Sequence, residues 1–135
     1  MILYNVPGRT GMNITVDTVV ELAKHKNIVG LKDATDNINY AMDILSKTKD
    51  MDFVLYSGCD DNILPFMAAG GKGVISVLSN VYPRETELLT QLILKGDLKK
   101  ARELAYDLND ISSLRLSDSD KQIANACSSI MVIYV

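Results

Sequence analysis

A single lysine at the end of a short apolar segment is the first candidate for chemistry. The residues before it, Ile28–Leu31, predict a buried strand, and Lys32 is the charged residue that follows. Burial disfavours an ammonium group, so the pKa of Lys32 is expected to fall toward neutral pH. A neutral amine attacks carbonyl carbons and can form an imine. In the competing interpretation, Lys32 is simply the first solvated residue after a strand, as most lysines in this setting are.

A tyrosine and an arginine accompany a second expected strand. Met1–Val6 predicts a strand that Pro7-Gly8 breaks; Tyr4 lies in it, and Arg9 follows in the predicted loop. A phenol can relay a proton, and a guanidinium can bind a carboxylate through two parallel hydrogen bonds. Together with an imine-forming lysine, these groups suit an aldolase that acts on keto acids. Solubility and turn geometry also place tyrosine and arginine in loops, which is the competing interpretation.

Alternating strands and helices are expected to position these groups. Strands are predicted at residues 1–6, 28–31, 53–56 and 74–78, with amphipathic helices between them. This order predicts a parallel α/β sheet, in which functional residues gather at the C-terminal ends of the strands. The expected rim carries Tyr4 and Arg9, Lys32, Ser57-Gly58 with Asp60, and Ile75 with Ser76. We divide the chain into four βα units (1–82), C-terminal helices (83–114) and an atypical tail (115–135).

Composition excludes several classes of function. The chain has 135 residues, 47% of them hydrophobic and 23% charged, and a formal net charge of -3. One globular domain is expected, with nothing that favours nucleic acid or a membrane surface. We find neither a transmembrane segment nor a signal peptide and expect a cytoplasmic protein. Cys59, Cys127 and the single His25 form no metal-binding or disulfide pattern, so neither a metal nor a cofactor is expected.

Four ordered segments carry a more specific signal than their spacing alone. They are YNVPGRTG at Tyr4–Gly11, GLKDAT at Gly30–Thr35, SGCDD at Ser57–Asp61 and GGKGVISV at Gly70–Val77. Over residues 1–114 the chain resembles the dihydrodipicolinate synthase family, within the Schiff-base aldolases that also include the N-acetylneuraminate lyases. The first segment resembles the tyrosine-bearing motif of that family, and the second resembles its Schiff-base lysine motif.

The resemblance implies a lyase of lysine and diaminopimelate biosynthesis. By that resemblance, Lys32 binds pyruvate as a Schiff base, and Tyr4 relays protons. The backbone of Ile75 contacts pyruvate, and Arg9 holds the carboxylate of aspartate semialdehyde. Arg9 also separates this branch from the N-acetylneuraminate lyases, which use a different second substrate.

The resemblance further implies half of a (β/α)₈ TIM barrel, because family members are about twice as long. The chain corresponds to strands five to eight followed by C-terminal helices. The hydroxyl motif, second tyrosine and lysine-inhibition site of the family fall in the first four units, which this chain lacks. A truncated or frameshifted chain is therefore expected, with Arg115–Val135 an unrelated polar stretch that ends in the apolar, β-prone Ser128–Val135. The alternative function is a catalytically silent remnant that self-associates or binds a partner.

An isolated half barrel should assemble with itself. Its end strands, Met1–Val6 and Val74–Leu78, would leave unpaired backbone groups, and the interior side chains would be uncovered. We therefore expect a homo-oligomer in which two copies related by a two-fold axis pair edge to edge.

Overall fold

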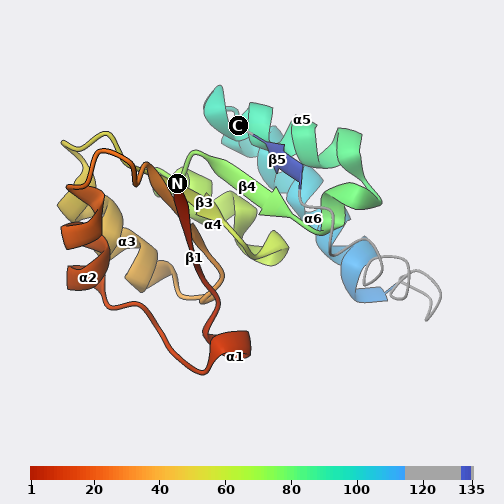
Figure 1. Ribbon diagram of the computed structural model, residues 1–135. Helices are drawn as coiled ribbons and strands as arrows, with labels where there is room; N and C mark the ends of the chain where they lie inside the picture. The colour runs from red at the N-terminus through yellow and green to blue at the C-terminus, as the bar shows by residue number, and fades with distance from the viewer. Residues whose placement is uncertain (115–131, 135) are drawn as a thin grey trace.

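The computed structural model describes residues 1–114 and 132–134 of the chain (Figure 1). The described elements are, in order, β1 (Ile2–Asn5), α1 (Pro7–Thr10), α2 (Val16–Ala23), β2 (Gly30–Asp33), α3 (Ile38–Thr48), β3 (Val54–Ser57), the short 3₁₀ helix η1 (Asp60–Asn62), α4 (Ile63–Ala68), β4 (Gly73–Ser76), a second 3₁₀ helix η2 (Leu78–Asn80), α5 (Pro83–Leu94), α6 (Leu98–Leu114) and β5 (Val132–Tyr134). Strands and helices alternate through β4, as predicted.

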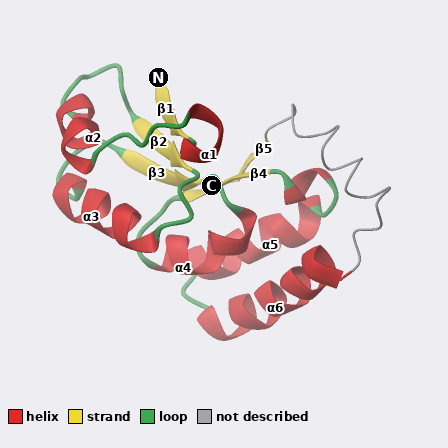
Figure 2. Ribbon diagram, turned by 90° about the horizontal axis from the view of Figure 1, so that it is seen from below, coloured by secondary structure: helices red, strands yellow, loops and turns green. Residues whose placement is uncertain are grey.

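The strands form one sheet with the order β1-β2-β3-β4-β5. The first four strands are mutually parallel, which confirms the predicted parallel α/β architecture. Figure 2 shows α2, α3, α4 and α5 following one side of this sheet. Short connections of this kind bring the C-terminal ends of the parallel strands to one rim.

The two faces of the sheet have different environments. On the helix-covered face, Leu31 and Leu55 are completely buried against side chains of α2, α3 and α4. On the opposite face of β1, Ile2 and Tyr4 remain 38% and 45% exposed. Side chains alternate between faces along a strand, so Tyr4 and its partner in β2, Lys32, share the face that carries no helix.

A second core joins the remaining helices to β4. It is formed by Ile63 and Met67 of α4, Val74 of β4, Leu89 and Ile93 of α5, and Ala101 and Leu108 of α6. This cluster anchors the two C-terminal helices on the same side of the sheet as α4. Among the described helices, none is both long and apolar enough to cross a membrane.

Two local expectations were wrong. The segment after Pro7 is not a loop but the short helix α1, because proline at its first position fits a helical backbone and Gly11 ends it in the left-handed conformation (φ 70°). The strand near Val74 does not leave a free edge, because β5 pairs antiparallel with β4, with Ile75 opposite Ile133. Apart from Val132–Tyr134, the predicted atypical tail, 115–135, lies outside the described residues.

Candidate active site

The register of the first two strands brings Tyr4 and Lys32 together. Tyr4 pairs with Lys32 in the parallel ladder, and Asn5 pairs with Asp33. The Nζ atom of Lys32 lies 4.4 Å from the centroid of the Tyr4 ring. At this distance the ring face attracts the ammonium form of the lysine, while the phenol stands beside the amine. The structure therefore brings together two of the residues singled out in the sequence.

Lys32 is buried, with 5% of its surface exposed. Burial lowers the pKa of its amine below the ordinary value, in the direction expected from the sequence. The negative charge of Asp60 opposes this shift, the Arg9 guanidinium adds to it, and Cys59 opposes it. The pKa of this buried amine therefore depends on both positive and negative neighbours, as is common for functional groups in proteins.

The chain after β3 crosses closely over the lysine side chain. A Cβ atom on Gly58 would lie 3.0 Å from Cε of Lys32, 2.9 Å from Cβ of Ala34 and 3.0 Å from the carbonyl oxygen of Asp33. The absence of a side chain at Gly58 therefore lets this segment pass over Lys32. The amide of Gly58 donates to the same Asp33 carbonyl at 2.7 Å, which holds the crossing in place.

Arg9 and Ile75 occupy the same rim from different elements. Arg9 is exposed in the last turn of α1, and its charge reaches the amine of Lys32. Ile75 is buried in β4, where it follows Val74, the ladder partner of Ser57. Both residues thus lie at the C-terminal ends of the parallel strands, where the sequence predicted them.

A buried polar network lies behind the rim, on the helix-covered face. Asn5 donates through Nδ2 to Tyr40 Oη at 3.1 Å and to Asn13 Oδ1 at 2.7 Å. Its Oδ1 accepts the amide of Ile14, and the Tyr40 hydroxyl donates to the Ile14 carbonyl at 2.7 Å. Burial raises the pKa of Tyr40 to about 12, so the phenol stays protonated and serves as a donor. Through Asn5, Asn13 and Ile14, the network joins the two ends of the segment that carries α1 and Arg9.

Sequence reasoning missed this network. The signal was available in β1, because Asn5 shares the buried face of the strand with Leu3 and its polar groups must find partners there. Asp33 is similarly buried beside Lys32, on the opposite face, and accepts hydrogen bonds from the amide and hydroxyl of Thr35. Burial raises the pKa of Asp33, although its Thr35 and Asn5 hydrogen bonds oppose the shift.

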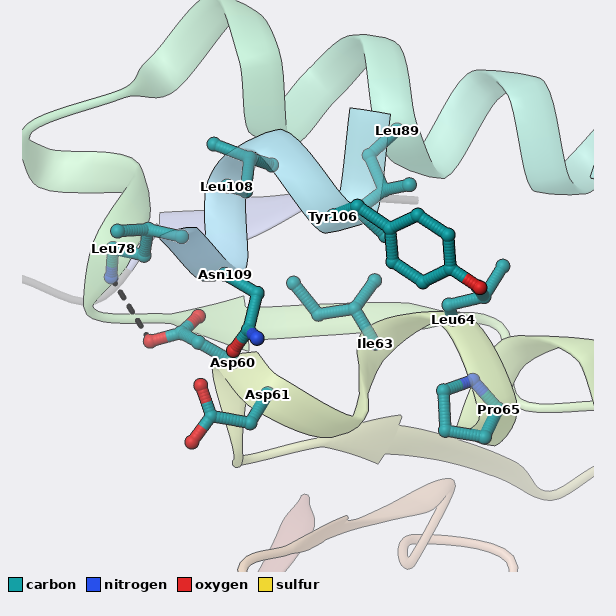
Figure 3. Close-up of a pocket in the computed structure, with 11 residues that line it drawn as sticks. Asp60, Asp61, Ile63, Leu64, Pro65, Leu78, Leu89, Tyr106, Leu108 and Asn109 are labelled. Atoms are coloured by element: carbon teal, nitrogen blue, oxygen red, sulfur yellow. Dashed lines mark hydrogen bonds between the residues drawn. The ribbon is translucent and has the colours of Figure 1, made fainter. Parts of the chain in front are cut away.

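A separate apolar cavity of about 280 Å³ lies between α4, α5 and α6. Figure 3 shows its lining, which includes Asp60, Ile63, Leu64, Leu78, Leu89 and Tyr106. Neither Lys32, Tyr4 nor Arg9 contributes to it. No lysine among the described residues therefore lines this cavity, which is separate from the strand rim that carries Lys32 and Tyr4.

The described residues contain no cluster of three or more His, Cys, Asp or Glu side chains that could hold a metal ion. The strand rim instead carries an amine, a phenol and a guanidinium, the side chains of Lys32, Tyr4 and Arg9.

Curated relatives extend the resemblance beyond the four segments. A 4-hydroxy-tetrahydrodipicolinate synthase of Methanospirillum hungatei is 48% identical over 106 residues, which cover 78% of this chain and 36% of the relative. Another, from Natronomonas pharaonis, is 48% identical over 110 residues, covering 82% and 37% of the two chains. The chain thus spans well under half the length of these relatives.

Solved structures share the architecture. Dihydrodipicolinate synthase from Aquifex aeolicus matches with a TM-score of 0.82 at 41% identity, over 93% of this chain and 43% of that one. The enzyme from Thermotoga maritima matches with a TM-score of 0.78 at 35% identity, over 94% and 45% of the two chains. These matches agree with an α/β fragment of the fold of those enzymes.

The family match covers almost the whole chain. The model of the dihydrodipicolinate synthetase family matches residues 1–131. It extends past residue 114, where we expected the resemblance to end, so the description of 115–131 as unrelated sequence was wrong. With this match and the identities above, the chain belongs to the dihydrodipicolinate synthetase family.

Proposed function

We propose that this chain carries the Schiff-base half of a 4-hydroxy-tetrahydrodipicolinate synthase, a lyase that condenses pyruvate with aspartate semialdehyde in lysine and diaminopimelate biosynthesis. The observation that carries the proposal is the buried Lys32 amine, with its lowered pKa, 4.4 Å from the ring centroid of Tyr4. An amine in this setting is a carbonyl nucleophile. The names of the relatives support the choice of substrates.

The proposed reaction starts at Nζ of Lys32. The neutral amine adds to the keto carbon of pyruvate. Two protons then reach the former carbonyl oxygen, one from the amine nitrogen and one through Tyr4, and the oxygen leaves as water to give a protonated imine. Loss of a proton from the methyl group gives an enamine, whose carbon attacks the aldehyde of the second substrate. Tyr4 relays the protons, and the backbone of Ile75 contacts pyruvate.

We further propose that the chain represents strands five to eight of the barrel, with residues 1–82 as four βα units and 83–114 as C-terminal helices. Coverage of 36% to 44% of the curated relatives supports a partial barrel. The helix-free face of β1, where Ile2 and Tyr4 are exposed, is the face that a closed barrel turns inward.

A second candidate function is a catalytically silent remnant that associates with itself or a partner. The partial exposure of Tyr4 favours it, because a proton relay open to water loses the exclusion of solvent that such chemistry uses. A steady-state assay with pyruvate and aspartate semialdehyde separates the two. Turnover above a matched Lys32→Ala control supports the synthase, and turnover equal to that control supports the remnant.

Arg9 is proposed to bind the carboxylate of aspartate semialdehyde. Replacing it by alanine should raise the half-saturating concentration of aspartate semialdehyde by about tenfold or more, because a two-pronged ionic contact is lost. Borohydride trapping of pyruvate, measured at a pH high enough for Lys32 to be neutral with or without the Arg9 charge, should stay within about twofold of the parent, since the lysine and tyrosine remain. Arg102→Ala, an exposed substitution on α6, is the control. If Arg9→Ala weakens the use of aspartate semialdehyde and the trapping of pyruvate to the same extent, Arg9 only stabilises the segment around α1.

The chain is also proposed to form a homo-oligomer through β1. This strand ends the sheet order, so its outer edge has no partner strand among the described residues. Because β5 already pairs with β4, we place the two-fold axis beside β1, so that the outer edges of β1 in two copies pair with each other. Light scattering at micromolar concentration should show a dimer, and Ile2→Lys should shift it to monomer by placing a charge beside the edge. A parent chain that is already a stable monomer contradicts this arrangement.

A further inference from the structure

Asp60 joins the segment that follows β3 to the segment that follows β4, beyond Ser57 and Val74, the last ladder pair of these two strands. Its Oδ2 atom accepts the backbone amides of Val77 and Leu78 at 3.1 and 3.0 Å. Figure 3 shows the bond to Leu78. Asp60 lies two residues after Gly58, which crosses the Lys32 side chain, while Val77 lies two residues after Ile75. The carboxylate thus ties the segment over the lysine to the end of β4.

The second oxygen of the same carboxylate has a different environment. Oδ1 of Asp60 is buried and has no hydrogen-bond partner among the described residues. A buried carboxylate oxygen without a donor is poorly screened by solvent, so its charge acts strongly on groups nearby. Asp60 thus has two separate properties: the hydrogen bonds of Oδ2 to Val77 and Leu78, called the tie below, and the buried charge at Oδ1.

We propose that Asp60 is a positioning residue of the Lys32 site, which sets the distance between the lysine and the Ile75 strand end and supplies the negative charge that stabilises the protonated imine. This inference rests on the proposed function, because it concerns the same amine. It adds to the site a residue of η1, an element outside the strands of the sheet.

The charges around the lysine support this role. Among the described residues, the groups that act on the Lys32 amine include the Tyr4 ring on β1, Arg9 on α1, and Cys59 and Asp60 after β3. Of the charges, Asp60 has the largest effect on the lysine and favours its protonated form. An imine that forms there is a cation at nearly the same position, so the same carboxylate stabilises it and raises the share of bound pyruvate present as the protonated imine, the form that loses a methyl proton.

The two properties of Asp60 can be separated by substitution. Asp60→Asn keeps an oxygen for the backbone amides but removes the charge. The pH midpoint of borohydride trapping at Lys32 should then move to lower pH by about half a unit or more, because the protonated amine loses a stabilising negative charge and its pKa falls. Exchange of the pyruvate methyl protons with deuterated solvent should slow at least about threefold, because the imine cation is less stable.

Asp60→Ala removes the tie as well. The pyruvate concentration that gives half-maximal trapping should rise about tenfold or more, because two backbone amides lose a charged acceptor and the end of β4 is released. The control is Asp61→Asn, since Asp61 is exposed and does not act on the Lys32 amine. Circular dichroism and thermal unfolding identify variants that fail to fold.

The outcomes distinguish this inference from the proposed function. Absence of trapping in the parent chain overturns both proposals. Trapping in the parent with an unchanged midpoint in Asp60→Asn, or with an equal shift in Asp61→Asn, overturns only the role of Asp60. An acidic shift together with slower methyl exchange supports the charge, and weaker pyruvate binding in folded Asp60→Ala supports the tie.

Discussion

Replacement of Lys32 by alanine is expected to abolish formation of the covalent pyruvate adduct, with a loss of about 1,000-fold or more in trapping rate. The reason is chemical, because the substitution removes the nitrogen that forms the imine. Lys32→Arg should fail equally, since a guanidinium stays protonated and is not nucleophilic. The measurement is the mass of the intact protein after incubation with pyruvate and borohydride.

The control for this prediction is a lysine elsewhere on the surface. Lys99→Ala, an exposed substitution on α6, should be labelled as well as the parent. Equal labelling of the parent and Lys32→Ala would falsify the assignment of Lys32 as the nucleophile, because the adduct would then sit on another amine.

A methyl group on Gly58 is expected to have the second largest effect. Its Cβ would meet Ala34, the Asp33 carbonyl and Lys32 Cε within 3.0 Å, and the first two cannot move without shifting β2. Gly58→Ala should therefore destabilise the fold by about 1 to 3 kcal/mol, the usual range for overpacking. The lysine side chain yields most easily, so trapping of pyruvate should fall by about tenfold or more.

Gly8→Ala is the matched control, because a Cβ there meets nothing within 4 Å. Urea unfolding gives the stability of each variant, and trapping is measured on protein shown to be folded. Parent-like trapping in folded Gly58→Ala, with stability equal to that of Gly8→Ala, contradicts the close passage of this segment over the lysine.

The part of the site that follows the strands could be predicted from the sequence. The strand was predicted at Ile28–Leu31 with Lys32 after it, whereas β2 spans Gly30–Asp33 and contains Lys32. The prediction was two residues early, but the rule that functional residues lie near the C-terminal ends of parallel strands still brought Lys32 to the rim with Tyr4. A period of two along β1 and β2 also sets both side chains on one face, given the register. Local pattern and a general rule of parallel sheets were sufficient here.

Contacts between distant segments could not be predicted in the same way. The bonds from Asp60 to Val77 and Leu78 span 17 and 18 residues, and the hydroxyl of Tyr40 reaches Ile14 across 26. The residues around Asp60 in the sequence do not show whether its carboxylate bonds to a distant backbone segment or is solvated in a turn. The pairing of β5 with β4 joins segments more than 50 residues apart, which hydrophobic periodicity cannot specify.

The central claim, an imine between pyruvate and Lys32, is tested most directly by locating the adduct in the unaltered chain. The protein is incubated with pyruvate, reduced with borohydride, digested and mapped by tandem mass spectrometry. We predict one modification, with the mass of pyruvate less one water plus two hydrogens, on the peptide that contains Lys32. An adduct on any other lysine, or no adduct at saturating pyruvate, contradicts the claim.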